Sequence, residues 1–236
     1  MRRLFVGLIA MIGYLVGTVV SEQTQSHALT GTLKKARDAG AVTIGYREAS
    51  FPFSYLDARR EPIGYSIDLC RLIVDAMSDE LGRELQLKWV PVTSASRFDA
   101  LTKGEIDLEC GSTTQNRERQ AIASFSPVIF VAGTKLMVRK DAGIRSFRDL
   151  NGKTVVVTAG TTNEKAMNDL QARFKTGATL VTTPDHDQSF PQFIAGQAEA
   201  SAGDELLHYG MTGSANAQHT VYLVRDFHPY APHGLT

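Results

Sequence analysis

The sequence predicts an α/β fold organised as two lobes, for three reasons. Short β-branched runs alternate with stretches of helical period, which is the pattern of a mostly parallel sheet. An extended apolar segment at 128–138 separates two blocks that share this layout. In each block a strand is followed by a turn rich in glycine and hydroxyl residues and then by a helix. A chain of 236 residues is long enough to bury the cores of two such lobes.

The first block predicts three strands and two helices around an aromatic loop. Apolar residues at spacings of three and four predict a helix over 66–81 that ends at Gly82. The segment 51–55 contains a proline between aromatic residues and predicts a loop. The remaining elements are strands at 42–45, 85–89 and 106–109 and a short helix at 97–103.

The second block repeats this order. Ser146 and Asp149 predict the cap of a short helix, because such side chains accept hydrogen bonds from the first helical turn. A longer helix is expected to open at 160–163 and to reach about residue 174. Strands are expected at 154–158, 179–183 and 222–224, the last of these being the final clear strand.

Residues 109–119, which we call the cradle, have the composition of an anion-binding turn. Apolar Ile106 and Leu108 precede it, so Ser112 to Thr114 are expected where a strand gives way to a helix. Such turns offer unpaired N–H groups and the positive end of a helix dipole, and Arg119 follows one turn later. The structural alternative is that Ser112 or Thr114 only caps the helix.

Residues 1–28 have the pattern of a secretory signal peptide. Arg2 and Arg3 precede an apolar run at 4–20, and small residues follow at Ser21 and Ala28. Cleavage after Ser21 and cleavage after Ala28 both fit. A single membrane anchor is the alternative, but the run is short for a span and is interrupted by glycines.

Charge and composition limit the partners. Lys plus Arg and Asp plus Glu number 25 each, so the chain lacks the basic excess typical of proteins that bind nucleic acid or an anionic membrane. No metal-ligand spacing such as Cys-x-x-Cys is present, so we expect no metal and no cofactor.

The two cysteines, Cys70 and Cys110, are expected to be buried thiols. Cys70 lies on the apolar face of the predicted helix and Cys110 at the end of a predicted strand. An oxidising compartment would allow a disulfide, but the sequence does not show whether the two Cα atoms are close enough to form one.

Six motifs occur in one order along residues 29–210. They are GYREASFPFSY at 45–55, GYSID at 64–68, VTSASR at 92–97, ECGSTTQNRER at 109–119, VTAGTT at 157–162 and DHDQSF at 185–190. On these motifs the chain resembles the periplasmic solute-binding proteins of amino-acid ABC importers, and most of all their glutamate/aspartate-binding branch.

The resemblance implies a set of residues that bind an acidic amino acid. Arg119 is expected to take the α-carboxylate as a two-pronged partner, helped by Ser112, Thr114 and Thr162. Asp204 is expected to take the α-ammonium. The side-chain carboxylate is expected to meet Arg47, Ser94, Arg97 and His186. Three arginines facing one aspartate would leave positive charge for a negative ligand.

Each of these residues also has a purely structural interpretation. Arg47 and Arg97 are of a type that usually lies on the surface, and His186 stands between two aspartates in what resembles an exposed loop. Thr162 and Asp204 are residue types that cap helices.

The resemblance further implies a two-lobed periplasmic-binding-protein-like fold of type II. The expected division is a signal peptide at 1–28, lobe 1 at 29–130, lobe 2 at 131–226, and at 227–236 the start of a return segment to lobe 1. We expect that return to be incomplete and irregular, because the segment is broken by prolines and the chain stops at Thr236, whereas family members continue. The small residues at 198–203 predict an under-filled layer in lobe 2.

The function implied is capture of L-glutamate or L-aspartate by a free, monomeric periplasmic protein and delivery to the membrane permease of an ABC importer. The sequence does not choose between the two ligands. Two alternatives remain: a dehydratase-like cleft enzyme of the same fold, and a truncated fragment that no longer binds.

Overall fold

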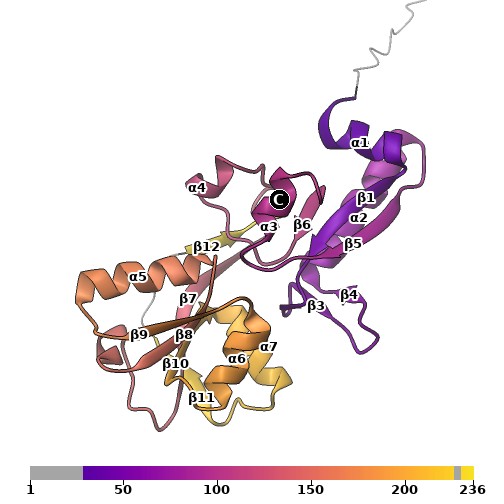
Figure 1. The fold of residues 1–236 in the computed structure, drawn as a ribbon. Helices are drawn as coiled ribbons and strands as arrows, with labels where there is room; N and C mark the ends of the chain where they lie inside the picture. The colour runs from indigo at the N-terminus through magenta and orange to yellow at the C-terminus, as the bar shows by residue number, and fades with distance from the viewer. Residues whose placement is uncertain (1–28, 226–229) are drawn as a thin grey trace, which may run out of the picture.

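The computed structural model describes residues 29–225 and 230–236, which form two lobes of α/β structure (Figure 1). The predicted signal peptide at 1–28 lies outside the described residues, as do residues 226–229. The predicted α/β class and the two-lobed arrangement are confirmed.

The first lobe is built on a parallel three-stranded sheet in the order β5-β1-β6. A small antiparallel sheet, β2-β3-β4, lies beside it and includes part of the aromatic loop. The elements of the first lobe are α1 Gly31–Ala39, β1 Ala41–Tyr46, β2 Ala49–Ser50, β3 Ser54–Leu56, β4 Pro62–Ile63, α2 Tyr65–Leu81, β5 Gln86–Pro91, α3 Arg97–Thr102, β6 Leu108–Cys110 and α4 Arg117–Gln120.

The central strand of this lobe is covered by helices on both faces. One face of β1 packs against Ile67, Cys70 and Val74 of α2, the residues whose spacing predicted the helix. Gly82 ends α2 in the left-handed conformation, as the sequence predicted. On the other face α3 contributes Ala100 to a second apolar cluster. The predicted helices and strands of this lobe are therefore confirmed to within about two residues.

The prediction of two buried thiols is wrong, because Cys70 and Cys110 form a disulfide. Their Cα atoms lie 6.4 Å apart, within the range that a disulfide spans. The packing of α2 across β6 brings the two residues together, although 40 positions separate them in the sequence. The bond ties α2 to the strand that leads into the cradle.

The second lobe is built on a mixed sheet in the order β11-β7-β10-β8-β9, with β12 also paired to β7. Its elements are β7 Phe130–Arg139, the 3-10 helix η1 Phe147–Leu150, β8 Thr154–Thr158, α5 Thr162–Phe174, β9 Thr179–Thr183, α6 His186–Ile194, β10 Ala200–Asp204, α7 Glu205–Ser214, β11 Val221–Leu223 and β12 Tyr230–His233. Ser146 and Asp149 form the capping box predicted for the short helix.

Alternating residues of β8 divide the core of this lobe into two layers. Val155 and Val157 face Met167 and Leu170 of α5. Val156 faces the opposite side, where α6 packs with Phe193, and Figure 1 shows α6 and α7 on the side of the sheet away from α5. This period of two, with a helix layer on each face, is the pattern expected for buried strands.

The small residues that predicted an under-filled layer lie mostly in β10. This strand is fully buried at the centre of the sheet. A Cβ atom built on Gly203 would lie 2.9 Å from Nε2 of His208, so the imidazole of α7 occupies the space beside the glycine. Burial lowers the pKa of His208 to about 3, which keeps the ring neutral in this position. The small residues of β10 therefore leave room for a histidine that sequence reasoning did not consider.

The prediction of an irregular return segment is wrong for residues 230–233, whereas residues 227–229 lie outside the described residues. Tyr230–His233 form a strand that pairs antiparallel with the first residues of β7. The chain then returns to the first lobe, where Thr236 exchanges backbone hydrogen bonds with Glu109. Residues 222–224 are therefore not the final strand, and β7 and β12 together join the two lobes (Figure 1).

Candidate functional site

The loops that follow several strands of both lobes converge on one enclosed site. The first lobe contributes residues from the starts of α3 and α4 and from the cradle, and the second lobe contributes the starts of α5, α6 and α7. The lining residues are Ser94, Arg97, Ser112, Thr114, Arg119, Thr161, Thr162, Asn163, His186 and Asp204. The structure thus brings together all of the predicted site residues except Arg47.

Asn116, and neither Ser112 nor Thr114, caps the helix after the cradle. The Asn116 side chain accepts a hydrogen bond from the backbone N–H of Arg119 at 2.8 Å, so the capping alternative for the two hydroxyls is wrong. Ser112 and Thr114 are buried and face the site. Because α4 is a single turn, its dipole contributes little to the cradle.

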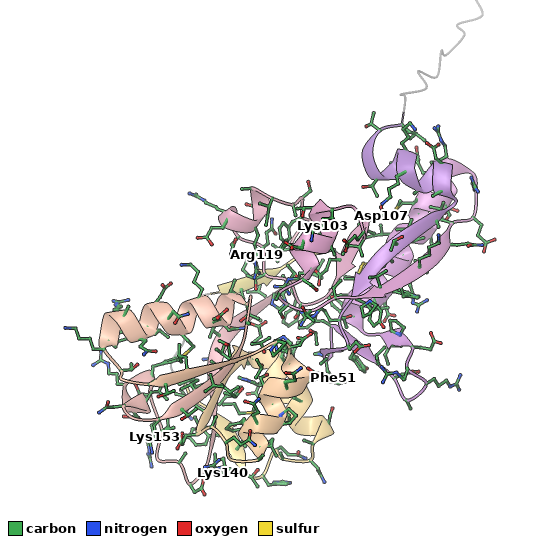
Figure 2. All side chains as sticks on the ribbon, in the orientation of Figure 1. Phe51, Lys103, Asp107, Arg119, Lys140 and Lys153 are labelled. Carbon is green, nitrogen blue, oxygen red and sulfur yellow. A yellow bond between two sulfur atoms is a disulfide. The ribbon has the colours of Figure 1, made fainter. Side chains whose placement is uncertain are left out.

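Arg119 spans the junction of the two lobes, where Figure 2 labels it. Its Nη1 donates to the carbonyl oxygen of Thr114 at 2.8 Å, and its Nη2 donates to that of Gly160 in the second lobe at 3.1 Å. The guanidinium also stacks over the ring of Phe98 at 5.3 Å. Partial burial lowers the pKa of Arg119, against the opposing effect of nearby carboxylates.

Thr162 faces the cradle from the second lobe. Thr161 caps α5 by accepting from the backbone N–H of Glu164 at 3.1 Å, so the capping alternative for Thr162 is wrong. The Thr162 hydroxyl lies 3.1 Å from the Thr114 hydroxyl across the site. The two lobes are therefore in hydrogen-bond contact at this point.

Asp204 stands at the N-cap position of α7 without making a side-chain capping bond. Its Oδ2 lies 3.2 Å from Nε2 of His233, and its buried Oδ1 has no hydrogen-bond partner among the described residues. Burial acts to raise the pKa of Asp204, but the close contact with His233, with the charge of His186, lowers it overall. The site therefore presents an ionised carboxylate with one free oxygen.

The far end of the site contains donors without partners. Arg97 is 2% exposed, so the prediction that this residue type lies on the surface is wrong here. Burial lowers the pKa of Arg97 to about 9, which the charge of Glu109 partly opposes. Among the described residues, Nε of Arg97 and Oγ of Ser94 are buried atoms that lack a hydrogen-bond partner. Such atoms are costly unless another group satisfies them.

His186 is buried rather than an exposed loop residue. Its Nδ1 lies 2.8 Å from the hydroxyl of Thr158. Burial, with the charge of Arg47, lowers the pKa of His186 to about 4. The ring is therefore neutral at pH 7 and contributes hydrogen bonding rather than positive charge.

Arg47 is fully buried but does not line the site cavity. Its Nη2 forms an ion pair with Asp185, which also caps α6 by accepting from the backbone N–H of His186. Nε and Nη1 of Arg47 have no hydrogen-bond partner among the described residues. Arg47 thus joins the first lobe to the second directly behind the site.

Two carboxylates outside the predicted ligand-binding set change the charge balance. Glu109 is fully buried and accepts from the Thr113 hydroxyl at 2.6 Å, and Asp185 pairs with Arg47. With Asp204 they match the three arginines, so the cluster as a whole lacks the expected positive excess. Glu109 lies in the motif at 109–119 and Asp185 in the motif at 185–190. Their places in these motifs could have indicated that both lie near the site.

Thr161 and Asn163 also line the site but were not predicted as site residues. Each belongs to the turn that opens α5, and the Thr134 hydroxyl donates to Oδ1 of Asn163 at 2.6 Å. The signal was the glycine-and-hydroxyl turn at 160–163, from which sequence reasoning selected only Thr162.

The site is closed. The cavity between the lining residues measures about 10 Å³, which is about the space that one water molecule requires. Contacts between Thr114 and Thr162 and between Arg119 and Gly160 hold the two sides together. Admission of an organic molecule to this site therefore requires the lobes to separate.

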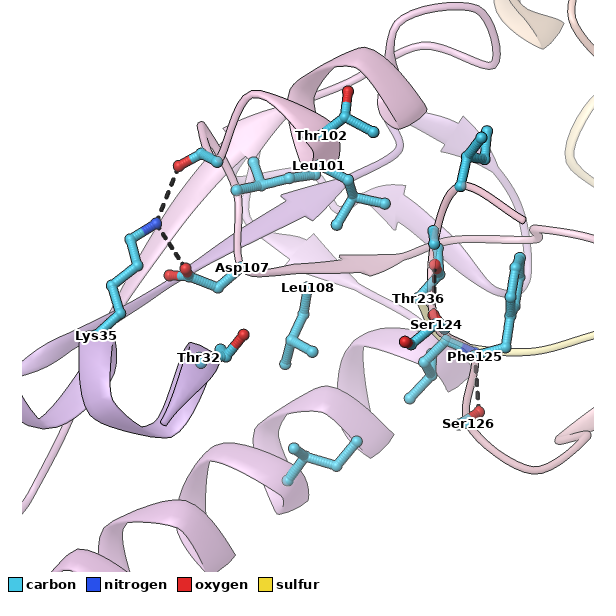
Figure 3. Close-up of a pocket in the computed structure, with 17 residues that line it drawn as sticks. Thr32, Lys35, Leu101, Thr102, Asp107, Leu108, Ser124, Phe125, Ser126 and Thr236 are labelled. Atoms are coloured by element: carbon cyan, nitrogen blue, oxygen red, sulfur yellow. Dashed lines mark hydrogen bonds and ion pairs between the residues drawn. The ribbon is translucent and has the colours of Figure 1, made fainter. Parts of the chain in front are cut away.

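A larger cavity of about 620 Å³ lies on the first lobe, away from this site (Figure 3). Apolar side chains such as Leu101 and Leu108 form much of its wall, and Lys35 is paired with Asp107 at 2.7 Å. Thr236 lies at one end, where its hydroxyl donates to the carbonyl oxygen of Ser124 at 2.8 Å. None of the predicted site residues lines this cavity.

Within residues 29–225 and 230–236, no cluster of three potential metal ligands is found. No helix in the same described ranges is both long and apolar enough to span a bilayer.

Comparisons with known proteins identify a family for the chain. Residues 42–210 match the model of the bacterial extracellular solute-binding proteins, family 3. The chain is 43% identical over 203 residues to the L-glutamate/L-aspartate-binding protein of Pseudomonas aeruginosa, covering 85% of this chain and 67% of that protein. It is 40% identical over 216 residues to the glutamate/aspartate import solute-binding protein of Salmonella typhimurium, covering 91% and 71%.

A solved structure with the same fold is an ancestral amino acid-binding protein described as a precursor of cyclohexadienyl dehydratase. It superposes with a TM-score of 0.71 at 29% identity, covering 87% of this chain and 85% of that one. The family match covers more than half of the chain, and the two relatives are well above 30% identical. The chain therefore belongs to the bacterial extracellular solute-binding proteins, family 3, which adopt a two-lobed type II fold.

Proposed function

We propose that the protein binds L-glutamate or L-aspartate between its lobes and delivers it to the membrane permease of an ABC importer. The observation that supports this most is a set of buried polar atoms without partners, gathered at one site. Arg97 Nε and Ser94 Oγ are donors at one end, and Asp204 Oδ1 is an acceptor at the other. A ligand with both a carboxylate and an ammonium group satisfies both ends.

The chemistry of an acidic amino acid accounts for the remaining side chains. The α-carboxylate is proposed to meet Arg119 and the hydroxyls of Ser112, Thr114 and Thr162. The α-ammonium is proposed to meet Asp204, and the side-chain carboxylate to meet Arg97, Ser94, His186 and Arg47. Because Glu109 and Asp185 balance the arginines, directed hydrogen bonds rather than net charge are proposed to select the ligand.

Arg47 is the member of this set whose present geometry differs most from the proposed role. It lies behind the cavity and is paired with Asp185, but two of its guanidinium nitrogens are unpartnered. In the proposed complex these nitrogens support the side-chain carboxylate from behind Arg97, and Asp185 keeps the guanidinium in place across the lobes.

Binding is proposed to proceed by separation and closure of the lobes about β7 and β12. The closed site has no room for an amino acid, so the ligand enters when the contacts between Thr114 and Thr162 and between Arg119 and Gly160 are broken. A ligand that replaces these contacts with stronger, charge-assisted ones shifts the equilibrium toward the closed form. The closed form then docks on the permease as a monomer.

The names of the two relatives support the ligand class and the transport role. Membership of an extracellular solute-binding family supports a location outside the cytoplasm, and we propose the periplasm. We further propose that the protein binds without catalysis. The dehydratase alternative requires a carboxylate that reaches the ligand and abstracts a proton, but Glu109 does not line the site and accepts from Thr113, and Asp204 is proposed to hold the ammonium group.

Isothermal titration calorimetry tests the proposal. L-Glutamate and L-aspartate are expected to bind with one site per chain, L-glutamine much more weakly, and the ligand is expected to be recovered unchanged after incubation. Arg119→Ala is expected to lose binding, whereas Lys103→Ala, a matched change of an exposed cation outside the site, is expected to keep it. Equal affinity for glutamine and glutamate would contradict the proposal, and consumption of ligand would favour the enzyme.

A further inference from the structure

We propose that His233 is a positioning residue for Asp204: its imidazole holds the carboxylate so that one oxygen faces the site and receives the ammonium group of the ligand. This inference rests on the proposed function, and it assigns a role to a residue near the end of the chain. No motif in the sequence indicates that role, because residues 227–236 were expected to form an irregular segment.

The backbone of His233 is fixed by two different segments. In β12 it pairs with Phe130 of β7, and its carbonyl oxygen accepts from the N–H of Ile129 at 2.9 Å. On its other side it forms an isolated β-bridge with Thr114, and the N–H of Gly234 donates to the carbonyl oxygen of Thr113 at 3.1 Å. His233 is therefore anchored to the cradle and to the connection between the lobes at once.

The ring of His233 has little freedom to move. It is fully buried, and it packs edge-on against Phe53 at 5.0 Å and beside Phe130 at 6.3 Å between ring centroids. Nε2 of the ring lies 3.2 Å from Oδ2 of Asp204, which is an ion-pair distance, although it makes no hydrogen bond among the described residues. The first lobe and the connecting strands thus hold an imidazole beside a carboxylate that belongs to the second lobe.

This contact determines what Asp204 can offer to a ligand. With Oδ2 at ion-pair distance from His233, the unpartnered Oδ1 remains for the site that Asp204 lines. The contact also keeps the carboxylate charged, since His233 is the largest of the influences that lower the pKa of Asp204. An ammonium group requires both conditions, namely an ionised carboxylate and a fixed oxygen.

The test compares L-glutamate with glutarate, which lacks only the amino group. His233→Leu removes the donor and keeps an apolar side chain against Phe53, whereas His233→Gln retains an N–H donor. We expect His233→Leu to weaken L-glutamate about tenfold and glutarate less than about twofold, because only L-glutamate uses Asp204. His233→Gln is expected to keep the ratio of the two dissociation constants within about threefold of the wild-type ratio.

Three outcomes would overturn the inference. An equal loss for both ligands would assign His233 a packing role, unchanged dissociation constants for both would remove its link to Asp204, and stronger binding of L-glutamate would make it a competitor of the ammonium. If His233→Leu does not unfold cooperatively, His233→Met, a more adaptable apolar residue, replaces it. Failure of the wild-type protein to bind L-glutamate would instead refute the proposed function, so the two failures are distinguishable.

Discussion

Removal of the disulfide between Cys70 and Cys110 is expected to destabilise the protein by about 4 kcal/mol. The bond closes a loop with a sequence separation of 40, and the loop-entropy relation for that length gives about 4 kcal/mol at 25 °C. For a chain of this size, that loss corresponds to a decrease of roughly 8–16 °C in the unfolding midpoint. Both cysteines are fully buried, so the disulfide is shielded from solvent in the folded protein.

The measurement is thermal unfolding of the oxidised protein, the reduced protein and the double variant Cys70→Ala with Cys110→Ala. The reduced protein and the variant are expected to unfold at similar midpoints, both well below that of the oxidised protein. A thiol titration under denaturing conditions supplies the control, with no free thiol expected before reduction. Coincident midpoints before and after reduction, or two free thiols in the purified protein, would refute the reasoning.

Three further predictions concern the site. Arg119→Ala is expected to raise the dissociation constant of L-glutamate by at least about tenfold, because it removes charge-assisted donors from an enclosed site; an unchanged constant by calorimetry would be inconsistent with the cradle. Arg47→Ala is expected to weaken L-glutamate more than L-glutamine in the same assay, and equal losses would remove Arg47 from the side-chain pocket. The third prediction is a pH dependence of stability. The pKa of His186 is lowered from 6.5 to about 4 in the folded protein, so as the pH falls the unfolded chain is protonated at His186 before the folded protein is. Neutral His186 contributes its full share of the free energy of unfolding above pH 6.5. About 3 kcal/mol of that free energy is lost as the pH falls from 6.5 to 4. In urea unfolding at pH 7 and pH 4.5, His186→Gln is expected to lose less stability than the wild type, and an identical loss would contradict this account.

Periodicity predicted much of the fold because the signals were local. The spacing of Ile67, Cys70 and Val74 predicted α2, and the β-branched run at 154–158 predicted β8 with its observed bounds. The turns after the strands predicted where the site lies, because the carboxyl ends of parallel strands in each lobe face the junction.

The predictions that were wrong concern contacts between residues far apart in the sequence. The disulfide depends on how α2 crosses β6, which no local pattern describes. The strand β12 contains Pro232 and looked irregular, yet it pairs with β7 about a hundred positions earlier, and Pro232 contributes its carbonyl oxygen to Gln115. His233 and Asp204 meet for the same reason.

The charge balance was misjudged because two acidic residues resembled ordinary ones. Glu109 stands at the end of a strand and Asp185 in a loop, where most carboxylates are solvated. Both are buried beside arginines in the folded chain. Burial of a charged residue depends on its partners in space, and this information is not present in the sequence pattern.

The most direct measurement is thermal unfolding of residues 29–236 alone and with saturating L-glutamate, L-aspartate or L-glutamine. A ligand that binds only the native state raises the unfolding midpoint by mass action, by an amount that increases with its concentration. We predict one cooperative transition whose midpoint rises with L-glutamate and L-aspartate and is nearly unchanged with L-glutamine. The absence of any increase with the acidic amino acids, or an equal increase with all three, would contradict the proposal that this cleft selects an acidic amino acid.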